Sequence, residues 1–129
     1  MNWEQIAMQI IHIKGKMPSL NEYIKWCRGN RYGASSKVKA IEQSIMIQLG
    51  KLKPISKPIT IHFQWHEKDR RRDKDNVAFA KKFLLDALQY ANILPNDNNR
   101  YIMGFSDGFD YGNKENGVTM YISEAEEKD

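Results

Sequence analysis

Alternating hydrophobic and polar residues predict four strands. The clearest pattern covers residues 59–66, where isoleucine, phenylalanine and tryptophan alternate strictly with threonine, histidine and glutamine, as in a strand with one buried face. Residues 8–14 are apolar and rich in isoleucine, which indicates a first strand. Residues 101–105 and 118–122 alternate in the same way, and we expect them to be strands joined by a glycine-rich connection over residues 107–117.

Hydrophobic spacings of three and four residues predict the helices. Residues 36–52 show this spacing and begin with a serine, a residue type that caps helices. Residues 76–91 carry an apolar stripe at the same spacing. The turn at residues 18–21 is expected to lead into a short helix through Cys27. Residues 28–35 contain two glycines and two arginines and are expected to form a mobile basic loop.

The order of these elements (strand, helix, strand, helix, strand, strand) sets the fold class. It predicts an α/β or α+β fold in which helices cover a single mixed sheet. The chain has 129 residues, the length of one domain, and it shows no internal repeat, no low-complexity segment and no domain boundary. We therefore expect residues 1–129 to form a single domain, with an acidic tail at residues 124–129.

The charge of the chain is basic and unevenly distributed. The formal net charge is +4, and the tail contributes −3, so residues 1–123 carry +7. A body with this charge attracts polyanions such as nucleic acids, although basicity alone does not identify a nucleic-acid-binding protein.

The cysteine content and the hydropathy exclude several kinds of protein. Cys27 is the only cysteine, so the chain has no internal disulfide and no cysteine-based zinc site. The three histidines lack the spacing of metal ligands, and the first residues lack the parts of a secretory signal. No apolar run approaches the roughly 20 residues that cross a bilayer. We therefore expect a soluble, cytoplasmic protein with no membrane partner.

Asp73 and Asp75 lie within a basic cluster, just before the helix predicted over residues 76–91. Residues two apart on an extended segment point the same way, so both carboxylates can face one cation. Carboxylates this close repel each other, and nearby arginines together with a hard divalent cation such as Mg²⁺ would compensate their charge. Either aspartate could instead cap the helix, because acids are favoured at a helix N-terminus. One acid can cap while the other binds metal, so the two interpretations do not exclude each other.

Helix periodicity indicates which residues accompany these acids. Lys82 follows Asp75 by seven residues and Asp86 follows Lys82 by four, so the three side chains are expected on one side of the helix. Lys82 and Asp86 alone would be an ordinary surface ion pair. Beside a metal–phosphate site, Lys82 could neutralise the charge on a phosphate under attack. Asp97 lies in a polar turn and carries little weight by itself.

Four motifs, taken together, cover most of the chain. They are Met-Pro-Ser-Leu-Asn-Glu-Tyr at residues 17–23, Ser-Ser-Lys at 35–37, Asp-Arg-Arg-Arg-Asp-Lys-Asp-Asn at 69–76, and Leu-Asp-Ala-Leu at 85–88 followed by Ile-Leu-Pro-Asn-Asp at 93–97. This arrangement resembles the RusA family of Holliday-junction resolvases, which cut four-way DNA junctions. The stretch from the third motif to Leu-Asp-Ala-Leu is its most specific part.

The resemblance implies the roles of individual residues. Asp73, Asp75 and Asp97 correspond to the metal-binding acids of the family, and Lys82 corresponds to its catalytic lysine. The stretch between the third and fourth motifs is about three residues longer than in well-known members, close to one helical turn. Because of this insertion, Lys81 stays an alternative to Lys82.

The last motif departs from the family pattern. Where the family has paired acids, this chain has Asn96 and Asp97. Asn96 can still coordinate a metal through its carbonyl oxygen, but it brings less charge to the site.

The resemblance also implies an activity and partners. It implies a homodimeric endodeoxyribonuclease, bacterial or phage-encoded, that resolves four-way DNA junctions by paired symmetric nicks during recombination and repair. Mg²⁺ is the expected cofactor, with Mn²⁺ able to substitute, and it would acidify the attacking water to leave a 5′-phosphate and a 3′-hydroxyl. One active site per subunit, related by a two-fold axis, would supply the two nicks. The residues expected to contact DNA are Asn21, Arg28, Arg31, Lys37, Arg70, Arg71, Arg72 and Lys74.

Two other functions remain open from the sequence. The basic face could belong to a catalytically silent DNA- or RNA-binding module, in which the acids only cap and pair. A metal-dependent phosphohydrolase acting on nucleotides would use the same acids but would turn over small substrates. Nicking of branched DNA in the presence of Mg²⁺ separates the resolvase from both.

Overall fold

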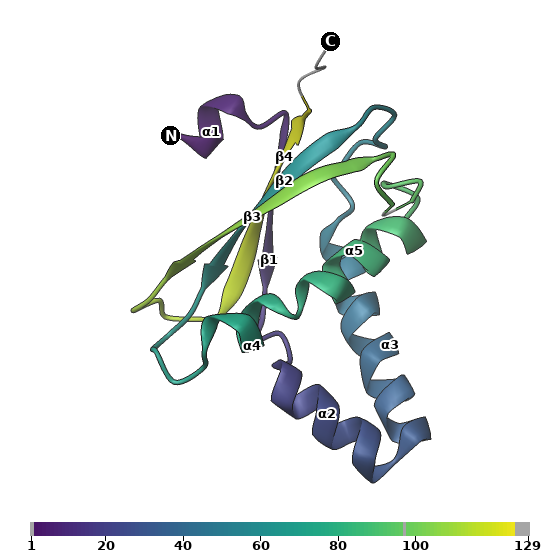
Figure 1. Ribbon diagram of the computed structural model, residues 1–129, viewed down its shortest axis with the longest axis vertical. Coiled ribbons are helices and arrows are strands. Elements are labelled where there is room, and N and C mark those ends of the chain that lie inside the picture. The colour runs from purple at the N-terminus through teal and green to yellow at the C-terminus, as the bar shows by residue number, and fades with distance from the viewer. Residues whose placement is uncertain (1, 97, 126–129) are drawn as a thin grey trace.

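The computed structural model describes residues 2–96 and 98–125 and builds them around one four-stranded sheet (Figure 1). The strands are β1 (Gln9–Lys14), β2 (Ile59–His66), β3 (Ile102–Asp110) and β4 (Gly117–Glu124), in the spatial order β1-β4-β2-β3. β2 and β3 are parallel, whereas β4 is antiparallel to both of its neighbours. The α+β fold with a single mixed sheet, expected from the order of elements, is therefore confirmed.

The strands match the alternating patterns, with one difference in β3. The sequence predicted a glycine-rich connection from residue 107, but β3 continues to Asp110. Gly108 lies within the strand opposite Gln64 of β2, whose side chain occupies the space that a side chain at position 108 would need. This glycine permits a close cross-strand approach and does not mark a turn.

After β1 come two helices that are almost continuous with each other. They are α2 (Leu20–Gly29) and α3 (Arg31–Gln48), separated only by Asn30. The prediction of a mobile basic loop over residues 28–35 is wrong. The Asn30 side chain accepts hydrogen bonds of 3.0 and 3.1 Å from backbone N–H groups in the first turn of α3, so the polar residue that suggested a loop caps a helix.

The segment predicted as one helix over residues 76–91 is two helices. They are α4 (Lys74–Ala78) and α5 (Lys81–Tyr90), with a break at residues 79–80. A further short helix near the start, α1 (Trp3–Ile6), was not predicted. In the part of the chain that the structure describes, no helix is long and apolar enough to span a membrane.

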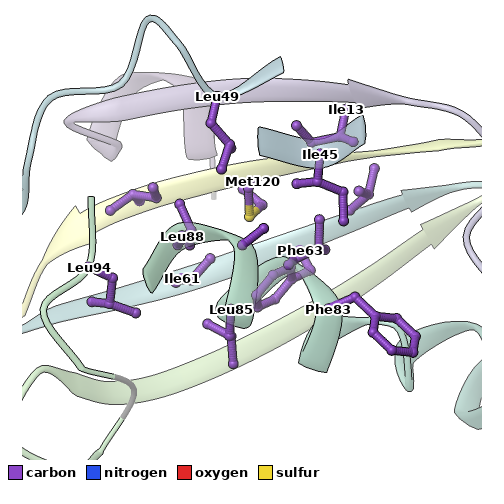
Figure 2. Packing of buried hydrophobic residues seen from close by; sticks show 14 of the residues in the cluster. Ile13, Ile45, Leu49, Ile61, Phe63, Phe83, Leu85, Leu88, Leu94 and Met120 are labelled. Carbon is purple, nitrogen blue, oxygen red and sulfur yellow. The ribbon is translucent and has the colours of Figure 1, made fainter. Parts of the chain in front are cut away.

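The hydrophobic core lies between one face of the sheet and the helices α3 and α5 (Figure 2). α3 contributes Ile45 and α5 contributes Leu88, and both are fully buried. From the sheet, Phe63 and Met120 meet them. These are positions that the hydrophobic spacing assigned to buried faces, and their burial explains why the two helices lie across the sheet.

The other face of the sheet is polar. His66 Nδ1–H donates a hydrogen bond to Asp110 Oδ2 at 2.9 Å, and its Nε2 atom is hydrogen-bonded to the Thr119 hydroxyl at 2.7 Å. His62 contacts Ser106 at 2.7 Å and stacks on Trp3 of α1, with ring centroids 4.3 Å apart. The cross-strand partners satisfy the two histidines, which lie on the polar face as the alternation predicted.

The two ends of the parallel pair β2–β3 carry different loops (Figure 1). At the carboxyl ends, residues 67–73 lie beside the turn of residues 111–116, where Glu67 N–H donates to Asp110 O at 2.9 Å. α5 returns the chain to the amino ends of β2 and β3, where the connection from α5 to β3 begins. A strand of eight residues, the length of β2, spans roughly 25 Å, so the two sets of loops are far apart.

Candidate metal and nucleic-acid site

Two of the sequence motifs meet where α2 and α4 begin. Asn21 N–H, in the first turn of α2, donates to Asn76 Oδ1 in α4 at 3.3 Å. Ser19 caps α2 in a reciprocal arrangement with Glu22, which fixes the direction of the helix. The Pro-Ser-x-Asn and Asp-x-Asp-Asn motifs are therefore neighbours in space, although more than 50 residues separate them in sequence.

Asp73 and Asp75 are exposed at the start of α4. Asp73 occupies the N-cap position in an extended conformation, but its side chain makes no cap hydrogen bond. Asp75 lies in the first turn, and within residues 2–96 and 98–125 neither carboxylate forms an ion pair. Capping therefore does not occupy the Asp73 carboxylate, and both acids can reach a ligand in solution.

The third predicted acid, Asp97, lies outside the described residues. Its neighbours Asn96 and Asn98 are at the amino end of β3, where Asn98 O accepts from Ile102 N–H at 3.0 Å. The Asn96 carbonyl, considered above as a metal ligand, accepts from Asn98 N–H at 3.1 Å. Asp73 follows the opposite end of β2, so α5 separates the two acidic segments (Figure 1). Among the residues that the structure places, no three side chains of His, Cys, Asp or Glu form a metal-binding group.

Lys81 is held against the sheet. Its ammonium forms an ion pair with Asp107 Oδ2 at 2.7 Å, and Trp65 Nε1 donates to the other oxygen of the same carboxylate at 2.9 Å. The ammonium also lies 5.2 Å and 5.0 Å from the ring centroids of Phe63 and Phe105. Lys81 therefore anchors α5 to β3, which is a structural role.

Lys82 faces away from the sheet and toward solvent. Its side chain is 59% exposed, and its ammonium is 3.5 Å from Asp86 one turn later on α5, a loose ion pair. The charge of Lys82 also acts on Tyr23 in α2. A hydrogen bond with Cys27 is the main cause that raises the pKa of the Tyr23 hydroxyl, and the positive charge of Lys82 lowers it. Of the two candidate lysines, Lys82 is the one that a phosphate could approach, which favours it over Lys81 for the catalytic role.

Aromatic rings hold two cations that are close to the acids in sequence. The Arg70 guanidinium lies 4.1 Å from the Tyr111 ring centroid, and the Lys74 ammonium lies 5.7 Å from both the Tyr111 and Phe109 centroids. Tyr111 begins the turn after β3, and sequence reasoning did not single it out. No spacing pattern links it to Arg70, because only the parallel pairing of β2 and β3 brings them together.

Asp110, the last residue of β3, connects the loops at the carboxyl ends of β2 and β3 to the polar face of the sheet. Burial raises the pKa of its carboxyl, but hydrogen bonds from His66, Asn113 and Gln64 outweigh burial and lower the pKa below its usual value. Asn113 Nδ2 donates to Asp110 at 2.7 Å and to Glu67 O at 3.0 Å, so one side chain ties the 111–116 turn to the 67–73 loop. This network fixes the loop that leads to Asp73.

Arg72 is used inside the protein, and we correct the predicted DNA-contacting set by removing it. Its guanidinium donates to both carboxylate oxygens of Glu67, at 2.8 and 2.9 Å, and to Met17 O at 2.7 Å. The Arg72 side chain is only 16% exposed and Glu67 is buried. This bidentate pair attaches the acidic loop to the segment before α2.

Replacing Arg72 by methionine is expected to lower the free energy of unfolding by about 3 kcal/mol, because Glu67 would keep a buried charge without its cation. Urea denaturation followed by circular dichroism measures this loss. Arg71→Met is the matched control, since the Arg71 side chain is 89% exposed and should contribute less than about 0.5 kcal/mol. Similar losses for the two variants would contradict the structural role of Arg72.

Asn21, Arg28, Arg31 and Lys37, which are also predicted to contact DNA, lie on the hairpin of α2 and α3, which projects from the sheet (Figure 1). Arg28 lies in the last turn of α2 and Arg31 begins α3, and both are exposed. Lys37 lies over the Trp26 ring at 5.0 Å. The hairpin therefore presents cations on a helical frame and not on a mobile loop.

No protein-family model matches this chain, and no curated protein matches it either. The resemblance to the RusA family therefore depends on the four sequence motifs alone.

Proposed function

We propose that the protein is a Mg²⁺-dependent endonuclease that resolves four-way DNA junctions. The observation that carries this proposal is the pair Asp73 and Asp75, whose carboxylates are exposed and make no ion pair in the described chain. Arg70 and Lys74, which are close to these acids in sequence, hold their cations over aromatic rings. A pair of uncompensated acids together with cations that are held in place suits a site that takes both a metal ion and a phosphate.

The donor set fits magnesium. Asp73 and Asp75 offer carboxylate oxygens in an exposed position, and hard cations such as Mg²⁺ prefer one or two carboxylates with phosphate oxygens and water. When bound, the ion would supply neutralisation of phosphate charge and an acidified water. The chain itself supplies the remaining functions. Arg70 and Lys74 would orient the DNA backbone, and Lys82 would stabilise charge on the phosphate as the bond breaks.

The proposal requires two copies of the chain. The described neighbours of Asp97 lie at the amino end of β3, beyond α5 from Asp73 and Asp75. A second copy, related by a two-fold axis, could bring its own 91–101 segment to the acid pair of the first. The same axis would place two equivalent sites on a junction that itself has near two-fold symmetry.

Cleavage mapping on a mobile four-way junction tests the proposed function. With Mg²⁺ we expect paired nicks at symmetric positions on opposing strands, with a 5′-phosphate at each nick, and no reaction in EDTA. Linear duplex of the same sequence is the control substrate and should stay intact. Binding without nicking in Mg²⁺ or Mn²⁺ would contradict the proposal.

A catalytically silent nucleic-acid-binding module is the second candidate. It is favoured by one observation, the exposed cations of the α2–α3 hairpin, which can bind phosphates without help from the acids. The mapping experiment separates the two, because the module would retard junctions in a gel without ever cutting them.

A further inference from the structure

Four side chains form a chain of hydrogen bonds across the polar face of the sheet. Asp110 of β3 accepts from His66 Nδ1 of β2 at 2.9 Å. His66 Nε2 is hydrogen-bonded to the Thr119 hydroxyl of β4 at 2.7 Å, and the same hydroxyl is hydrogen-bonded to His12 Nδ1 of β1 at 2.7 Å. The chain therefore crosses all four strands in their spatial order.

The hydrogen bonds of this chain have one direction when both imidazoles are neutral. The Asp110 carboxylate only accepts, so the single N–H of His66 is at Nδ1. His66 Nε2 then accepts from the Thr119 hydroxyl, which has one hydrogen to donate. Thr119 must therefore accept from His12 Nδ1, and the neutral His12 ring keeps an unshared electron pair at Nε2.

One added proton changes what His12 presents to solvent. His12 is exposed, and its Nδ1 atom is bonded to the buried Thr119, so Nε2 lies on the outer side of the ring. A proton added there makes Nε2 a donor. If the charge moves along the chain to His66, the bonds through Thr119 reverse and His12 Nε2 still carries its hydrogen. The two rings thus take up one proton as a unit, because a second proton would place two like charges on either side of one hydroxyl.

His12 lines an open groove with a volume of about 480 Å³ where β1 ends and β4 begins. Lys14 and Lys114, which also line it, are exposed and form no ion pair in the described part of the chain. The titratable groups of the groove are His12 and Lys14 from β1, His66 from β2, and Lys114 and Glu115 from the turn after β3. Cations therefore outnumber the one acid, and protonation of the chain adds to the excess.

The groove borders the loop that leads to the acid pair. Asn116, which lines the groove, accepts through Oδ1 from Lys68 N–H of that loop at 2.9 Å. The same turn begins with Tyr111, whose ring lies under the Arg70 guanidinium at 4.1 Å. The turn therefore has Arg70 at its start and Lys114 further along, so a nucleic-acid backbone held at Arg70 can continue over the turn into the groove.

We propose that this groove is a second phosphate-binding site for DNA, in which His12 Nε2 donates to a backbone phosphate; the inference rests on the proposed function. A phosphodiester offers only acceptors, so it is repelled by the electron pair of neutral His12 and attracted by the N–H of the protonated chain. Lys14 and Lys114 add attraction that does not depend on this proton. Binding therefore takes up one proton, and the affinity for DNA rises as the pH falls.

Fluorescence anisotropy of a labelled four-way junction in EDTA measures binding without cleavage. From about pH 8 to about pH 6 we expect the wild-type affinity to rise roughly tenfold, the effect of one charge-assisted hydrogen bond. In His12→Phe, which keeps a ring but has no donor, the rise should shrink to less than about twofold. The affinity at pH 8 should stay within about twofold of the wild type. A wild-type affinity that ignores pH, or a rise that survives in His12→Phe, would overturn the proposal.

The salt dependence tests the lysines of the groove. In Lys114→Met the slope of log affinity against log salt should fall by about one, because one phosphate contact is lost. Lys51→Met is the matched control, since Lys51 is equally exposed but does not line the groove, and it should leave the slope unchanged. Equal slopes for the two variants would show that the groove takes no phosphate.

Nitrogen-15 NMR of the imidazole rings tests the chain without DNA. At about pH 8, His12 and His66 should both carry their hydrogen at Nδ1, and His12 Nε2 should gain one at lower pH. Inorganic phosphate should then shift the His12 Nε2 resonance and leave that of the buried His62 unchanged. A His12 ring protonated at Nε2 at pH 8, or one that ignores phosphate, would refute the inference. A wild type that binds with this pH dependence but never nicks would end the proposed function and leave the phosphate site standing, whereas a wild type that binds no DNA would end both.

Discussion

Replacing Asp75 by asparagine is expected to abolish Mg²⁺-dependent nicking of four-way junctions, by a factor of about 10³ or more. Asparagine keeps the size and one oxygen of aspartate but loses the charge that a divalent cation requires. The side chain is exposed and makes no ion pair in the described chain, so the fold should be unaffected. Junction binding should stay within about twofold, because the phosphate contacts come from the basic residues.

Gel assays with a labelled junction measure both quantities. Asp69→Asn is the matched control, since Asp69 lies in the same loop, is exposed, and pairs only with the exposed Arg71 at 3.4 Å. It should nick at the wild-type rate. An Asp75→Asn variant that still nicks would remove the acid pair from the mechanism, and one that no longer binds would mean that the site had been distorted.

The elements of the fold could be predicted where a local pattern matches one buried face. The alternation over residues 59–66 matches β2, and the stripe over 36–52 includes the buried Ile45 of α3, although that helix begins at Arg31 and ends at Gln48. Prediction failed where one residue type is common in two different kinds of local structure. Asn30 caps a helix where a loop was expected, and Gly108 makes room for Gln64 within a strand. Only the tertiary partner decides between such uses.

In the candidate site, too, local features were visible in the sequence and tertiary contacts were not. The acid pair and its cations were proposed from local motifs, because two carboxylates two residues apart are visible in the sequence. The partners of Arg72 and His12 were not predictable, because both depend on contacts between segments that only the fold brings together. Asp97 was assigned by motif alone, and a motif does not reveal which copy of the chain supplies a residue.

Mixing two inactive variants, Asp75→Asn and Asp97→Asn, is expected to restore nicking. The described neighbours of Asp97 lie at the opposite end of α5 from Asp75, so a site that contains both acids would draw them from different subunits. In a mixed dimer, one site then carries both substitutions and the other carries none. Each variant alone has no intact site. Random exchange of subunits should leave roughly a quarter of the sites intact.

The products distinguish this arrangement from sites built within one subunit. Because a mixed dimer has a single intact site, it should make single nicks and few of the paired nicks that separate a junction into duplexes. Subunits can be exchanged by brief exposure to urea, and nicks counted on a junction labelled on each strand in turn. Mixing Asp73→Asn with Asp75→Asn is the control and should restore nothing, since these acids start the same helix and belong to one site. If the first mixture also stays inactive while the wild type cuts, Asp97 does not reach Asp75 from a second copy, and the acid pair must work with other groups of its own chain.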